Sequence, residues 1–183
     1  MSINYSGNKR SSGSVNFKSG VTAVGTTNAS TAVISDNDFF TVIGTCTNAA
    51  YAAVLPKHPV LGKPYLVKNN GAHMCTVFPH SSGSGSTVDN GASFVLGNNG
   101  CEASFIASDS TPLTANAQSV EWHSFGKSGK CVIATTAATA LQACINYDVQ
   151  VHVSQADAYA ITIPNPEDAV GMKAEVFCEV EGG

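Results

Sequence analysis

The side chains that could act as a catalyst are few and scattered along this chain. Ser124 and Lys127 match the S-x-x-K spacing of a serine nucleophile with a lysine base, but the partner motifs of that class do not accompany them. The run from Gly83 to Ser86 lacks the Gly-Lys-Ser/Thr that binds phosphate, and no helical pattern follows it. Glu167 and Asp168 fall in an expected turn, where carboxylates are usually solvated. We therefore expect no catalytic residue and no enzymatic activity.

The closest approach to a metal site is the group of His73, Cys75 and His80. A structural zinc ion takes four ligands around one point, whereas a fourth ligand is not evident here and a strand alternates its faces. We expect these side chains to be structural, with no metal and no cofactor. Trp122 is the only tryptophan, and we expect it to anchor the core or to lie in an interface.

The charge of the chain is low and unevenly distributed. Charged residues make up 12% of the sequence, about half the usual share. Lys9, Arg10 and Lys18 are the only charged residues before Asp36, so this segment carries +3, while six basic and thirteen acidic residues give the remainder −7. Such a basic segment suits docking on an acidic protein surface or nucleic acid, or it is a solvated tail. We interpret these three residues as candidate anchors.

The cysteines and the absence of long apolar stretches indicate the cellular compartment of the protein. No pair of cysteines has the C-x-x-C spacing, which argues against a zinc ribbon or a thioredoxin-type site. No apolar leader follows Met1, and no apolar stretch reaches the roughly 20 residues that span a membrane. We expect reduced, buried thiols and neither secretion nor membrane insertion. The cysteines are Cys46, Cys75, Cys101, Cys131, Cys144 and Cys178.

The elements that must position these residues occur in two copies along the chain. The first copy comprises Thr31-Ala32-Val33, Tyr51 to Pro56 and Gly62 to Val67. The second comprises Thr139-Ala140-Leu141, Tyr159 to Pro164 and Gly171 to Val176. The interval from the Thr-Ala pair to the Tyr-Ala pair is the same in both, which predicts an internally repeated architecture.

Hydrophobic alternation with a period of two predicts an all-β fold. It is clearest at 149–153 and 172–180, which we expect to be half-buried antiparallel strands. Short strands separated by turn clusters favour antiparallel β-sandwich or jelly-roll-like units, or a barrel. The only helical candidate is Thr136 to Cys144. The other expected strands are 39–45, 51–55, 64–68, 74–78, 92–96, 101–107, 119–125 and 131–134.

These patterns divide the chain into three parts. Residues 1–20 are expected to form an extended N-terminal arm, residues 21–126 a first β unit, and residues 131–183 a second, abbreviated β unit. The second copy stops before an equivalent of the hairpin that follows the first. Because half a sandwich is a poor independent fold, we expect it to complete a sheet with the first unit or with a neighbouring subunit.

Between residues 64 and 125 the chain resembles a β module of tailed-phage virion proteins. The resemblance rests on the strand ending in Asn70-Gly71, the strand ending in Phe78-Pro79, the Asp89-Asn90-Gly91 turn, and the aromatic and Trp-containing strands 103–108 and 121–124. The Tyr159 to Pro166 stretch is similar to another element of the same proteins. Together these segments cover roughly two thirds of the chain.

The resemblance implies a virion structural protein of a bacteriophage, assembled in the host cytoplasm. We expect a capsid decoration, cement or minor capsid protein that stabilises the shell, as a homo-oligomer, most simply a trimer. Its partners would be the major capsid protein or other virion proteins; neither a membrane nor nucleic acid is expected as a partner. The alternative is a tail or head fibre module that binds a receptor or glycan.

Overall fold

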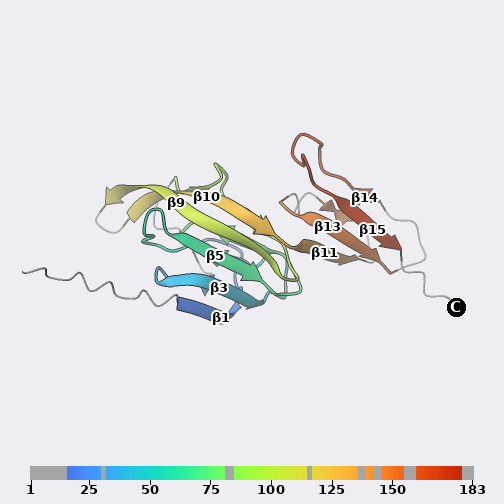
Figure 1. Ribbon diagram of the computed structural model, residues 1–183, viewed down its shortest axis with the longest axis horizontal. Helices are drawn as coiled ribbons and strands as arrows, with labels where there is room; N and C mark the ends of the chain where they lie inside the picture. The colour runs from blue at the N-terminus through green and yellow to red at the C-terminus, as the bar shows by residue number, and fades with distance from the viewer. Residues whose placement is uncertain are drawn as a thin grey trace, which may run out of the picture.

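A computed structural model describes residues 16–29, 32–80, 85–114, 117–135, 139–141, 146–154 and 160–178 (Figure 1). Within these ranges the chain is all-β, with fifteen strands and no α-helix. Of the predicted helix Thr136 to Cys144, only residues 139–141 are described, and Thr139–Ala140 is a strand. The helix prediction is therefore wrong at these positions, because strand pairing decides there over local alanine propensity.

The N-terminal strands wind between two sheets, and within each sheet they pair with one another in parallel. Each passage through the second sheet supplies the long crossover that a parallel pair requires. We call these strands the first coil. Those of the first sheet are β1 (Asn16–Thr22), β3 (Asp38–Thr45) and β5 (Pro64–Asn69), and those of the second sheet are β2 (Ala32–Val33), β4 (Ala52–Val54) and β6 (Cys75–Phe78).

The chain then reverses direction and covers the last turn of the first coil. β8 (Phe94–Leu96) pairs antiparallel with β6, and β9 (Cys101–Thr114) pairs antiparallel with β5. β9 and β10 (Ala117–Ser128) form a long antiparallel hairpin, which we call the capping hairpin, and β7 (Thr87–Val88) lies parallel to β10.

A second coil repeats the arrangement of the first. β11 (Lys130–Thr135), β13 (Asp148–Val153) and β15 (Ala174–Cys178) form a parallel sheet, while β12 (Thr139–Ala140) pairs in parallel with β14 (Ile161–Thr162). The strands predicted from the repeat at 51–55 and 159–163 are therefore confirmed for the described residues; Tyr159 lies outside them. The register differs by one residue, since Ala32 pairs with Ala53 whereas Thr139 pairs with Ile161.

The positions of the predicted strands are confirmed, but their predicted direction is wrong for both coils. Strands 148–153 and 174–178, expected to be antiparallel, pair in parallel over five positions. Alternation reports that one face of a strand is buried, and it carries no information on the direction of the neighbour. The architecture is that of a β-solenoid closed by an antiparallel hairpin, rather than a jelly-roll sandwich.

The predicted segment boundaries fall within strands. β1 begins at Asn16, so the last five residues of the expected arm belong to the first sheet. β10 runs through residue 126 to Ser128, and a single residue, Gly129, separates it from β11. One hydrophobic core of buried residues runs from Ala23 to Val153, and Ile161 and Met172 pack against it.

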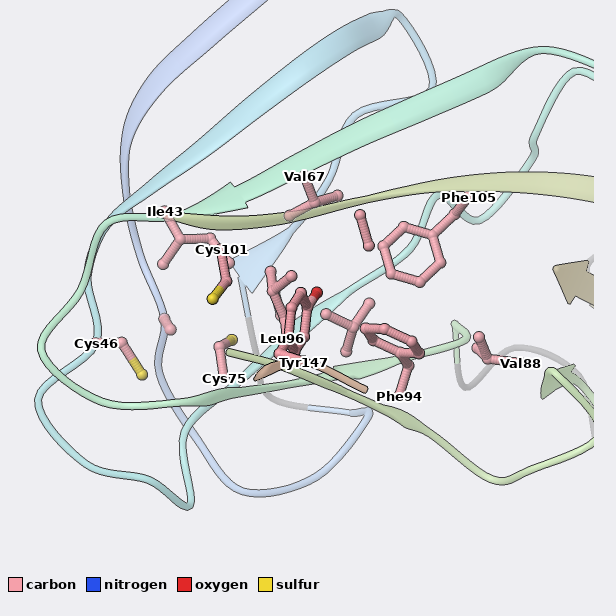
Figure 2. Packing of buried hydrophobic residues seen from close by; sticks show 14 of the residues in the cluster. Ile43, Cys46, Val67, Cys75, Val88, Phe94, Leu96, Cys101, Phe105 and Tyr147 are labelled. Carbon is pink, nitrogen blue, oxygen red and sulfur yellow. The ribbon is translucent and has the colours of Figure 1, made fainter. Parts of the chain in front are cut away.

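The core lies between the two sheets of the first coil and continues into the second coil (Figure 2). Phe94 meets Phe105 edge to face, with ring centroids 5.3 Å apart. Tyr65 meets Trp122 in the same way at 5.6 Å, and Trp122 is completely buried, as expected of a core anchor. Edge-to-face aromatic pairs add about 0.5–1.5 kcal/mol to the burial of their surface.

Candidate assembly surfaces

The predicted anchoring residues divide between described and undescribed parts of the chain. Lys9 and Arg10 lie outside the described residues. Lys18 lies on β1, the outermost strand of the first sheet, and is exposed. Phe17 beside it is also exposed and packs against Phe40 of β3 at a ring-centroid distance of 5.1 Å. A cation and an aromatic ring therefore lie together on the first strand.

Ser124 and Lys127 do not act on each other. The Ser124 hydroxyl donates to the carboxylate of Asp89, and the Ser124 N–H donates to Asp89 Oδ1 at 2.8 Å. The Lys127 ammonium lies 5.3 Å from the centroid of the Phe94 ring. These contacts tie β10 to the turn after β7 and to β8, so the S-x-x-K spacing has a structural explanation.

The capping hairpin brings together a serine, a histidine and a glutamate that the sequence did not single out. Ser108 Oγ lies 2.9 Å from His123 Nε2, and Glu121 Oε1 lies 3.5 Å from the same nitrogen. A serine–histidine–acid relay needs the serine and the acid on different ring nitrogens. The arrangement is therefore a polar contact across the hairpin. Only the pairing of β9 with β10, which sequence spacing does not reveal, could have located it.

Cys75 and His73, two of the residues considered as metal ligands, lie in different surroundings. Cys75 is buried in the core and hydrogen-bonded to Cys46, which lowers the pKa of the Cys46 thiol to about 7 and raises that of Cys75 (Figure 2). His73 is exposed in the preceding loop. Among the described residues, no three His, Cys, Asp or Glu side chains are grouped as metal ligands.

The thiols and the acidic pair are placed as follows. Cys46, Cys75, Cys101 and Cys131 are buried free thiols, and Cys178 is an exposed one; Cys144 lies outside the described residues. Burial raises the pKa of Cys101 to about 12, and neighbouring Cys131 adds to the shift. A buried thiol with a raised pKa, such as Cys101, behaves as a small apolar side chain rather than a nucleophile. Glu167 and Asp168 are exposed in a turn.

A buried asparagine joins the two coils next to a cavity. Asn98 Nδ2 donates to the carbonyl oxygens of Ala72 at 2.8 Å and Val132 at 2.6 Å, while the Val132 N–H donates to Asn98 Oδ1 at 2.8 Å. The amide thus pairs with β11 much as a neighbouring strand would. The adjacent cavity of about 270 Å³ is lined by Ala72, His73, Met74, Asn98 and residues 132–134. The Asn98 amide is fully engaged in joining the coils, which assigns it a structural role.

Among the residues that the structure describes, the strands at the two ends of the coiled architecture each have one edge without a neighbouring strand. β14 and β15, which we call the tail rung, each have one neighbour in their sheets among the described residues. Their counterparts in the first coil have two: β5 is also paired with β9, and β4 with β6. β1 and β2, the head rung, are likewise outermost in their sheets.

Comparison with protein-family models, with curated proteins and with solved structures finds no match to this chain. Over the ranges that the structure describes, no helix has the length and apolar character needed to cross a membrane. The fold and its open edges therefore carry the inference about function.

Proposed function

We propose that the chain is a virion structural protein, a capsid decoration, cement or minor capsid protein that stabilises an assembled shell. The observation that carries this proposal is the tail rung, whose strand edges are open where the equivalent edges of the first coil are covered. Open edges present unpaired N–H and C=O groups that pair readily with another chain. A low share of charged residues, 12%, supports the same role, because such a surface suits packing among neighbours.

The mechanism of stabilisation is binding that is selective for the assembled state. A protein that binds the shell but not its free subunits shifts the equilibrium toward the shell by mass action. Lys9, Arg10 and Lys18 would dock on an acidic face of the major capsid protein. Because an exposed ion pair contributes only about 0.2–1 kcal/mol, strand pairing and apolar contacts supply the remainder. The assembled form would be a homo-oligomer, with a trimer as the simplest case.

The second candidate is a tail or head fibre module that binds a receptor or glycan. The observation in its favour is the parallel coil, since coils of this kind extend by adding turns along one axis. In the loop between β8 and β9, the exposed side chain of Asn99 can hydrogen-bond a polar ligand.

The number of copies in purified particles tests the proposal. Quantitative mass spectrometry of virions is expected to find the chain in hundreds of copies if it covers the shell. A few to a few tens of copies would favour the fibre module, and its absence from the particles would overturn both. Stripping the protein should lower the temperature at which shells release their genome if it acts as a cement.

The anchoring role has its own test. Reversing charge at Lys9, Arg10 and Lys18 to Glu should lower occupancy on particles while leaving the fold unchanged by circular dichroism. Lys18→Arg keeps the charge and serves as the control. Equal occupancy of the reversed variant and the control would show that attachment does not depend on these residues.

A further inference from the structure

The head and tail rungs are built from the same kinds of strand. Each has one strand in each of two sheets: β1 and β2 at the head, β15 and β14 at the tail. Within both coils every rung pairs with the next in parallel. In Figure 1, β1 lies at the lower margin of the first sheet and β15 at the margin of the sheet formed with β11 and β13. Each open end therefore presents the edge geometry that the other end requires.

Both rungs also expose apolar side chains. Phe17 is 58% and Val33 55% exposed at the head, while Val176 is 49% and Phe177 42% exposed on β15. Ile163, next to β14, is 70% exposed. Covering such side chains contributes about 25 cal/mol for each Å² of apolar surface removed from water. An interface between the rungs would combine this burial with strand hydrogen bonds.

The charges of the two ends have opposite signs. Three basic residues give the first 35 residues +3, whereas residues 167–183 hold five acidic residues and one lysine, which gives −4. Two tail rungs facing each other across a two-fold axis would bring like charges together. Among the described residues, Lys18 lies on the head rung and Glu175 on the tail rung, so a tail rung facing a head rung brings these opposite charges together and favours head-to-tail contact.

We propose that the tail rung binds the head rung of a second copy, with β15 pairing in parallel with β1 and β14 with β2. The inference deepens the proposed structural role, on which it rests, by naming the chain's own copy as the partner of the open edges. Regular pairing is expected at Phe17 and Lys18, because the register of β1 shifts between Asn16 and Phe17 and again between Lys18 and Val21, around Gly20 with its φ of 70°. Such an interface is heterologous and closes into a ring, for example a trimer, or continues as a chain.

Three valine-to-lysine variants of the full chain test the interface by analytical ultracentrifugation. Val176→Lys blocks the tail rung, and Val33→Lys blocks the head rung. Val60→Lys is the control, because Val60 is at least as exposed (60%) as the other two valines and lies in the loop before β5, on neither rung. All four proteins should have the same circular dichroism spectrum, since each substituted side chain is exposed.

The wild type and the Val60→Lys control should sediment as oligomers, and more weakly so at high salt, which screens the charges of the two ends. Each blocked variant alone should sediment as the 18.8 kDa monomer. An equimolar mixture of the two blocked variants should form a dimer of twice that mass, because one retains a head rung and the other a tail rung.

Two results would overturn the inference. The first is a wild type that sediments as a monomer. The second is a Val33→Lys variant that forms dimers by itself, together with a mixture of the two blocked variants that forms no additional species, because this result indicates a two-fold tail-to-tail interface. Binding of the blocked variants to particles distinguishes this inference from the proposed function. If the wild type does not self-associate and the blocked variants bind particles as fully as the wild type does, the virion role stands and the head-to-tail contact is wrong. The absence of the chain from virions would remove the virion role while the mixing result stands by itself.

Discussion

Replacement of Asn98 by aspartate should sharply weaken the junction between the two coils. The substitution keeps the size and shape of the side chain and one oxygen to accept the Val132 N–H. It replaces the amide nitrogen, which donates to the carbonyl oxygens of Ala72 and Val132, by a carboxylate oxygen. Two donated hydrogen bonds then become contacts between oxygen atoms.

The size of the effect follows from these contacts. Two hydrogen bonds contribute about 1–3 kcal/mol together to the free energy of unfolding. Asn98 is only 6% exposed, so an aspartate there must either remain charged against two carbonyls or bind a proton, which costs about 1.4 kcal/mol per unit of raised pKa. We expect a total loss of about 3–4 kcal/mol at neutral pH, smaller in acid, where the protonated carboxyl can donate once.

Urea unfolding followed by the fluorescence of Trp122, the sole and fully buried tryptophan, measures this loss. Asn99→Asp is the matched control, because Asn99 is the exposed neighbour and the change in net charge is identical. Asparagine and aspartate both tolerate its left-handed φ of 52°. A loss for Asn98→Asp within about 1 kcal/mol of that for the control would refute the role assigned to the amide.

Three further results are expected. Hydrogen bonds, that from Lys173 foremost, hold the pKa of Glu175 at about 2, so the charged form stabilises the fold above the ordinary carboxyl pKa and loses this effect as the pH falls toward 2. The difference in melting temperature between wild type and Glu175→Gln should narrow over that range; a constant difference would contradict it. Gly129→Ala should destabilise the chain by at least about 1–2 kcal/mol more than Gly62→Ala in urea unfolding. Both glycines have positive φ, but a Cβ at residue 129 would lie 2.7 Å from the Cys101 Cα, whereas nothing lies within 4 Å at Gly62; equal losses would argue against the clash. Alkylation of the unfolded, unreduced protein should modify all six cysteines in mass spectrometry, and any disulfide found would reverse the expectation of reduced thiols.

The sequence predicted where the strands lie because burial of one face leaves a period-two pattern. The expected strand 64–68 is β5 at Pro64–Asn69, and 131–134 is β11 at Lys130–Thr135. The direction of pairing is set by the connections instead. The stretch between 39–45 and 64–68, with a short strand inside it, was long enough for a parallel crossover and could have indicated the coil.

The candidate surfaces were less accessible to sequence reasoning. Open edges are defined by which strands fail to find a neighbour, and this requires the whole topology. Asn98 shows the same limit: within a run of Gly and Asn it has the composition of a solvated turn, yet it is buried and joins Ala72 to Val132. Its partners are distant in sequence, so no local pattern marks it. Lys18 was noticed from charge alone, and its position on β1 was not expected.

The capping hairpin also has a consequence for the order in which the chain acquires its structure. β9 and β10 are adjacent in sequence, so their contacts close only short loops. Phe40 and Leu66, which pair in parallel, are separated by a full turn of the coil, so their contact closes a longer loop. We expect folding to begin at the hairpin, which offers β5 an antiparallel edge, and then to add β3 and β1 backwards along the chain. During synthesis, however, β1, β3 and β5 leave the ribosome before β9 exists. A nascent chain that pauses before Cys101 would therefore display β5 without its antiparallel partner, and this interval is when the protein most needs a chaperone.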